Sequence, residues 1–170
     1  MLKALPLTGE KKRPAALLLG SFPGVESLRR KQYYAHPRNL FWPLLSAALG
    51  TRDPENYNSR LRLLKTHRLA LCDTLQGCIR SGSLDSAIKT AVPNSEVSAF
   101  LRRFPRTPVL FTSKKAHALF TRYFTDERGD REEFCLPSPS PANAAQSRAA
   151  KTRLWKKIFA RVNGDGGKGL

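Results

Sequence analysis

The 170-residue sequence has few of the residues that disulfides, metal sites and membrane spans require. Its three cysteines, Cys72, Cys78 and Cys135, are an odd number without a CxxC pair, which favours reduced, mostly buried thiols over disulfides. An iron–sulfur cluster normally takes four thiolates, and no His, Cys and Asp residues have metal-ligand spacing, so we expect no metal and no cofactor. No apolar run approaches the length of a membrane span and no signal-peptide segment opens the chain, so we expect a cytoplasmic protein.

Acidic residues are also scarce, with 13 Asp and Glu against 30 Lys and Arg and a formal net charge of +17. Such a balance favours a polyanionic partner, because phosphates that pair with basic side chains release their counterions. A generally basic protein and a protein bound to an anionic membrane surface are the alternatives. The membrane alternative is disfavoured, because no predicted helix combines an extended basic face with exposed bulky apolar residues.

The residues that can carry chemistry gather between Gly20 and Trp42. The preceding apolar run, Ala15 to Leu19, predicts a strand buried on both faces. Glycine and proline then break the strand and predict a tight loop, and functional loops of α/β sheets follow the carboxyl ends of their strands. We call Gly20 to Asn39 the first loop, and its aromatic, amide and cationic side chains include Tyr33, Tyr34, His36, Arg38 and Asn39.

Strands and helices alternate along the rest of the chain. Further strands are predicted over 69–75, 109–112 and 133–136, and helices over 40–49, 53–67, 94–104, 113–124 and 146–162. This alternation predicts a three-layer α/β/α fold around a central, mostly parallel four-stranded sheet. We expect one domain over residues 1–162 with a basic N-terminal arm over 1–14, an irregular connection over 76–90 and a disordered Gly-rich tail over 163–170.

Three segments of the chain carry a family resemblance. GSFPG, SLRRKQYYAHPRNLFW and LPSPSPANA resemble the hypoxanthine-DNA glycosylase family of the uracil-DNA glycosylase superfamily, which is related to the mismatch-specific uracil-DNA glycosylases. The resemblance runs from about Leu17 to about Phe159. It implies a monomeric, monofunctional DNA glycosylase of base-excision repair that flips a deaminated base out of double-stranded DNA. Hypoxanthine is the first expected base, and uracil is the alternative.

Asn39 is the candidate catalytic residue. The residues alone favour a helix cap at this position. The resemblance implies catalysis, because Asn39 is the asparagine of the family's HPxN motif. The loop GINPG of the mismatch-specific enzymes holds an asparagine that handles the attacking water, and Phe22 stands in its place here. An amide can donate to a base carbonyl and accept from a water at once, so capping and catalysis are compatible.

Four side chains are candidates for holding the flipped base. Tyr33 and Tyr34 offer faces for stacking, although one of the two is as well placed in the core. Phe22 either closes the other side of the base or presents its backbone N–H. Asp73 follows a strand where the mismatch-specific enzymes have an Asn, and its carboxylate can accept the ring N–H of hypoxanthine or uracil. A turn or capping role for Asp73 is the alternative.

A second signature, Pro137 to Asn143, is a rigid segment that we call the proline–serine loop. In the superfamily the equivalent loop pinches the DNA backbone, and small hydroxyls suit phosphate oxygens. An ordinary surface loop and, for His36, a purely structural role are the alternatives. We expect DNA contacts from His36, Arg38, Lys114, Ser138, Ser140, Pro141, Asn143, Lys156 and Lys157, with Arg29, Arg30 and Lys31 adding basic charge.

The sequence departs from the family pattern at three places. Cys72 stands where the family has Trp, Thr112-Ser113 where it has Asn-Gly, and Pro139 where Thr is more frequent. These departures keep open a DNA- or RNA-binding module without catalysis. A nucleotide-handling α/β enzyme is disfavoured, because GxxxxGK and GxGxxG motifs are both absent. No lysine is placed by a motif to attack the sugar, so no strand cleavage is expected.

Overall fold

A mixed sheet organises the computed structural model, which describes residues 1–82, 84, 86 and 88–165. The strands lie in the order β2-β4-β3-β7-β8. Neighbours pair in parallel except β2, which is antiparallel to β4. Their bounds are Thr8–Gly9 for β2, Ala16–Gly20 for β3, Leu69–Asp73 for β4, Val109–Phe111 for β7 and Glu133–Cys135 for β8. The mostly parallel sheet is confirmed, and β2 adds a fifth strand to the four that were predicted.

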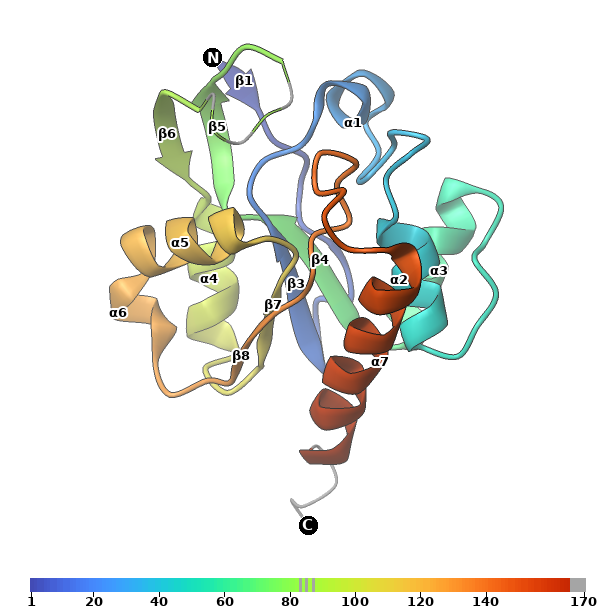
Figure 1. Ribbon diagram of the computed structural model, residues 1–170. Coiled ribbons are helices and arrows are strands. Elements are labelled where there is room, and N and C mark those ends of the chain that lie inside the picture. Colours follow the sequence, from blue (N-terminus) through green and yellow to red (C-terminus); the bar gives the residue numbers. More distant parts are fainter. Residues whose placement is uncertain (83, 85, 87, 166–170) are drawn as a thin grey trace.

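Helices cover both faces of this sheet, which confirms the three layers (Figure 1). Successive strand residues point to opposite faces, so Leu18 and Leu71 pack on one side while Leu17 and Leu19 pack on the other. The first side holds α2 (Phe41–Ala48), α3 (Tyr57–Thr66) and α7 (Arg148–Asp165). The second holds α4 (Ser95–Arg103), α5 (Lys114–Tyr123) and the short α6 (Thr125–Arg128). Each fully buried leucine stabilises this sandwich by about 1.5–3 kcal/mol.

A small second sheet replaces part of the irregular connection expected over 76–90. In it β5 (Leu75–Ile79) pairs antiparallel with β6 (Thr90–Pro93) and with β1 (Leu2–Lys3). The glycine in β5 made a loop the natural prediction, but Gly77 lies against β1, where a Cβ would come 3.2 Å from the Leu2 carbonyl oxygen. The N-terminal segment expected as an arm thus supplies two edge strands, β1 and β2.

Two helices begin at side-chain caps, at the residues where the sequence predicted the helices to start. Asn94 Oδ1 accepts the Glu96 N–H at 3.0 Å, and Ser113 Oγ accepts the Ala116 N–H at 3.0 Å. The short α1 (Val25–Arg30) lies inside the first loop and was not expected. At the other end, α7 continues to Asp165, and residues 166–170 of the expected tail lie outside the described residues.

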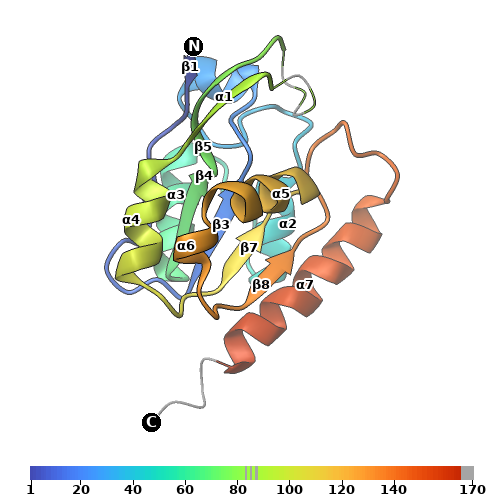
Figure 2. The same cartoon turned by 90° about the vertical axis from the view of Figure 1, so that its left-hand side faces the viewer.

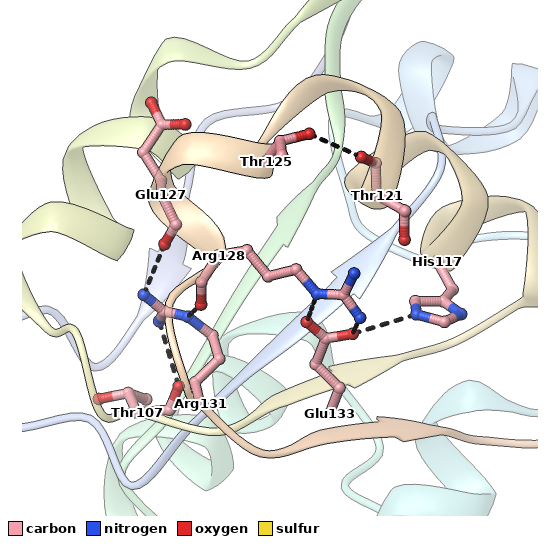
Figure 3. Close-up of polar contacts among 8 residues, drawn as sticks. All are labelled: Thr107, His117, Thr121, Thr125, Glu127, Arg128, Arg131 and Glu133. Atoms are coloured by element: carbon pink, nitrogen blue, oxygen red, sulfur yellow. Dashed lines mark hydrogen bonds and ion pairs between the residues drawn. The ribbon is translucent and has the colours of Figure 1, made fainter.

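Arg131 fixes the connection between α6 and β8 (Figure 3). The residue is 7% exposed, and its guanidinium donates five hydrogen bonds to the backbone carbonyls of Leu101, Phe104, Thr107, Glu127 and Arg128. Burial lowers the pKa of Arg131. Beside it, the Glu133 carboxylate accepts hydrogen bonds from the Arg128 guanidinium and from His117 Nε2, the latter at 3.1 Å. These bonds hold the entry of β8 and therefore the strand that leads to the proline–serine loop.

The parallel strands bring their carboxyl ends to one edge. Gly20 of β3 lies opposite Asp73 of β4, and Phe111 of β7 lies opposite Cys135 of β8. The first loop, Asp73, Thr112 and the proline–serine loop therefore start side by side. Figure 2 shows α7 leading away from that edge toward the opposite end of the molecule.

Candidate active site

A cavity of about 700 Å³ opens at the carboxyl edge of the sheet. Its walls come from the first loop, from the ends of β4 and β7, and from the proline–serine loop. The predicted residues that line it are Phe22, Tyr33, Tyr34, His36, Arg38, Asn39, Asp73, Ser138, Ser140, Pro141 and Asn143. Lys114, Lys156 and Lys157 lie outside the cavity, exposed on α5 and α7.

Asn39 lies at the point where the first loop enters α2. Its Oδ1 accepts the N–H of Phe41 at 2.9 Å, which satisfies one donor at the helix start. Among the described residues the Asn39 Nδ2 has no hydrogen-bond partner. The side chain is half-buried and lines the cavity, so Nδ2 and the second lone pair of Oδ1 remain for a ligand.

The two adjacent tyrosines have different environments. Tyr33 is 3% exposed, and its hydroxyl donates to the Leu5 carbonyl at 3.0 Å while Trp42 Nε1 donates to the Tyr33 carbonyl at 3.0 Å. Burial also raises the pKa of Tyr33. Tyr33 is therefore the core tyrosine of the pair, although part of it reaches the cavity wall.

Tyr34 takes the cavity side. Its ring stacks on Phe41 with centroids 3.8 Å apart and planes 9° from parallel, and its hydroxyl lies 2.9 Å from Thr112 Oγ1. The backbone is left-handed, with φ of 55°, a conformation that costs a non-glycine residue about 1–2 kcal/mol. Such strain persists where the surroundings impose it and is frequent at functional sites. Phe41 supports one face of the Tyr34 ring at the cavity.

Asp73 and Gly20 form the floor of the cavity where β4 and β3 end. The Asp73 side chain is 3% exposed. A Cβ on Gly20 would overlap Asp73 Oδ1 and lie 3.0 Å from the Tyr34 hydroxyl oxygen. The glycine thus allows a carboxylate and a phenol to approach the same strand end. Thr74 Oγ1 donates to the Gly20 carbonyl at 2.6 Å, and Asn94 Nδ2 donates to the Asp73 carbonyl at 2.9 Å.

Phe22 places its ring in a small cluster beneath the first loop. The ring is 6% exposed and packs with Leu75, Cys78 and Leu119. The Arg80 guanidinium lies 5.1 Å from the ring centroid and donates to the Pro23 carbonyl at 2.5 Å. The ring is therefore part of the support of the loop, and the backbone N–H remains the alternative contact to a base. Arg80 was not singled out in the sequence, because nothing local marks it as a neighbour of the first loop.

The proline–serine loop is internally bonded. Ser138 Oγ accepts the Ser140 N–H at 3.3 Å, and Ser140 Oγ accepts the Ala142 N–H at 3.3 Å, so each hydroxyl keeps its own proton for a ligand. Leu40 donates its N–H to the Pro139 carbonyl at 3.0 Å, which joins this loop to the start of α2. The basic pattern of α7 would place Lys151 on the exposed face of the helix, but the residue is 2% exposed and packs behind the loop.

The remaining predicted positions are distributed as follows. His36 Nδ1 accepts the Arg38 N–H at 3.1 Å, which fits the loop-holding role, and Arg38 itself is exposed. Cys72 accepts a hydrogen bond from Asn94 Nδ2 at 3.2 Å and packs with the α4 and α5 side of the core instead of the cavity. The sequence GSLD over residues 82–85 resembles a GSxD element of the mismatch-specific enzymes, and its Ser83 and Asp85 lie outside the described residues.

No three His, Cys, Asp or Glu side chains gather as cation ligands within the described part of the chain. Over the same residues, no helix has the length and apolarity needed to cross a membrane.

Comparison with known proteins gives the family. The sequence profile of the Uracil DNA glycosylase superfamily matches residues 8–162. A hypoxanthine DNA glycosylase of Methanosarcina acetivorans is 34% identical over 146 residues, which are 84% of this chain and 89% of that protein. Its namesake from Methanosarcina barkeri is 38% identical over 105 residues, which are 59% of this chain and 64% of that protein, so the match spans less than two thirds of the relative.

A solved structure agrees with these matches. The solution NMR structure of a Methanosarcina acetivorans protein, proposed to be a uracil DNA glycosylase, superposes with a TM-score of 0.77 at 30% identity. The superposition covers 95% of this chain and 98% of the other. The chain therefore belongs to the uracil DNA glycosylase superfamily.

Proposed function

We propose that this chain is a monofunctional DNA glycosylase that removes hypoxanthine from double-stranded DNA in base-excision repair. The observation that carries the proposal is the cavity, which brings an amide, a supported aromatic face and a carboxylate together from three separate segments: Asn39, Tyr34 and Asp73. Its volume of about 700 Å³ suits a flipped nucleotide. A base buried in the duplex has to leave the stack before its glycosidic bond can be reached.

Recognition of the base is assigned to Tyr34 and Asp73. Stacking on an aromatic ring is worth about 1–3 kcal/mol per base. An ionised Asp73 accepts the ring N–H of hypoxanthine, whereas adenine presents a lone pair at the same ring position. Uracil also carries a ring N–H, so it remains the alternative substrate for the same cavity. A mismatched deaminated base leaves the stack at lower cost than a paired one, which adds selectivity.

The chemistry is assigned to Asn39. Its Nδ2 donates to the base or to the attacking water, and the second lone pair of Oδ1 accepts from that water. The remaining stabilisation of charge comes from backbone dipoles and DNA phosphates. The reaction is hydrolysis of the N-glycosidic bond without a lyase step, and none of the described residues that line the cavity is a lysine.

DNA binding is assigned to the hydroxyls of Ser138 and Ser140 and to the exposed cations Arg38, Lys156 and Lys157. The net charge of +17 supports this contact with phosphates. We infer a monomer in the cytoplasm, consistent with three cysteines that form no disulfide with one another.

The test is alkaline cleavage of labelled duplexes that carry one hypoxanthine, uracil or xanthine, with wild type and Asn39→Ala side by side. We expect release from the hypoxanthine strand by wild type and its loss in the variant. Release from the uracil strand alone would keep the enzyme class and replace the substrate. Tight DNA binding without release from any strand would favour the noncatalytic binding module.

A further inference from the structure

Two side chains of α7 hold the two ends of the proline–serine loop. Trp155 Nε1 donates to the Pro137 carbonyl at 2.9 Å, and Lys151 Nζ donates to the Asn143 carbonyl at 2.7 Å. The donors are four residues apart, so they lie on the same face of the helix. Both side chains are almost fully buried, with exposed fractions of 0% for Trp155 and 2% for Lys151.

A lysine at this depth needs an explanation, because lysines are almost never fully buried without a partner. Among the described residues, Nζ has one acceptor, the Asn143 carbonyl, and no carboxylate within ion-pair distance. Burial lowers the pKa of Lys151. An ammonium group with a single hydrogen bond lowers fold stability relative to an apolar side chain of the same length. Core packing alone therefore gives no reason for lysine at this position.

The loop that Lys151 holds is connected to the rest of the site. Between the two anchored ends, the Pro139 carbonyl accepts the N–H of Leu40, the residue after Asn39. The proline–serine loop also supplies six of its residues, from Ser138 to Asn143, to the cavity wall. A displacement of the loop would thus reach both the surface that faces DNA and the segment that carries Asn39.

We infer that Lys151 is a positioning residue, which holds the proline–serine loop in the shape that grips the DNA backbone and supports the Asn39 segment. The inference rests on the proposed function for its consequence in excision, but the order of the loop is a property of the protein alone. Lys151 does not touch the base or the sugar in this role, because it is not among the residues that line the cavity.

The experiment compares Lys151→Met with wild type and with Lys65→Met. Lys65 is an exposed lysine in the last turn of α3, so its replacement removes the same charge away from the site. For Lys151→Met we expect faster amide hydrogen exchange confined to about residues 137–147, an unchanged or higher Tm, and an excision rate on hypoxanthine duplex that falls about tenfold. Lys65→Met should match wild type in exchange and excision.

A conservative variant completes the test. Lys151→Arg keeps donors near the Asn143 carbonyl and should recover loop protection and part of the excision rate. A fall in Tm with exchange rising throughout the core of Lys151→Met would assign Lys151 a purely structural role and overturn the inference, as would wild-type exchange in the loop. If the wild-type chain released no base, the proposed function would fail, while loop exchange and affinity for undamaged duplex would still support or refute the positioning role.

Discussion

Replacement of Asn39 by aspartate separates helix capping from catalysis. In the structure Oδ1 accepts the Phe41 N–H at 2.9 Å, while Nδ2 has no partner among the described residues. Aspartate keeps the acceptor oxygen and removes the N–H donors. Alanine removes both, so the two variants divide the functions of a single side chain.

The two variants are expected to differ in the free energy of unfolding but to share a large loss of excision rate. The bond to Phe41 contributes about 1 kcal/mol, and an aspartate near a helix start adds a few tenths of a kcal/mol. We therefore expect the free energy of unfolding to stay within about 0.5 kcal/mol of wild type in Asn39→Asp and to fall by about 1 kcal/mol in Asn39→Ala. Loss of one preorganised donor to developing charge lowers a rate by about 10²–10³-fold, or about 2.7–4 kcal/mol of activation free energy.

Urea unfolding and single-turnover excision of hypoxanthine duplex measure the two quantities on the same preparations. A large loss of excision in both variants, with Asn39→Asp as stable as wild type, would assign the chemistry to the amide donor. Full activity in Asn39→Asp with loss in Asn39→Ala would show that the acceptor oxygen is sufficient. Wild-type rates in both variants would refute a catalytic Asn39 and leave only its role at the start of α2.

Three further predictions concern the base platform, the DNA contact and the fold. Tyr34→Ala should weaken binding of the flipped base by about 1–3 kcal/mol and slow excision accordingly, with little loss of affinity for undamaged DNA, whereas Tyr33→Ala should mainly lower Tm. Equal losses of excision and of affinity for undamaged DNA in Tyr34→Ala would argue against stacking. Neutralising Lys156 and Lys157 together should make the plot of log affinity against log salt concentration less steep, by roughly 0.9 in slope for each lost phosphate contact. An unchanged slope would mean that α7 does not contact the DNA. Arg131→Met should lower the free energy of unfolding by about 3 kcal/mol or more, because the five backbone carbonyls that Arg131 contacts lose their donor (Figure 3). A loss below about 1 kcal/mol in urea titration would contradict a stabilising role of these hydrogen bonds.

Local pattern was sufficient for the central sheet and the main helices. The run Ala15 to Leu19 favoured a strand buried on both faces, and the spacing of Val97, Phe100 and Leu101 favoured a helix that buries one side. The small sheet was missed because its strands are held by pairing with distant segments. Nothing within Leu75–Ile79 shows that Leu2–Lys3 lies beside it.

The candidate site divides in the same way. Its membership could be predicted, because loops at the carboxyl edge of a parallel sheet meet regardless of detailed packing. Side-chain environment could not, since Tyr33 and Tyr34 are neighbours with ring centroids only 6.4 Å apart, and the local sequence does not show that one hydroxyl reaches Leu5 and the other Thr112. Lys151 reads as one more surface cation of a basic helix, and its burial depends on a carbonyl eight residues earlier that the loop folds back to present.

Charge outside the cavity and charge inside it have different consequences in this protein. The surplus of basic residues attracts any phosphate backbone, and such contacts carry little information about the base. Under the proposed function, discrimination between bases therefore has to come from groups that meet the extruded base alone. Asp73 is an acidic group in the cavity floor of a strongly basic chain, and the absence of a side chain at Gly20 is what lets it approach the Tyr34 hydroxyl. We propose that an ionised carboxylate there disfavours any base that turns a lone pair toward it, without contributing to the affinity for undamaged DNA.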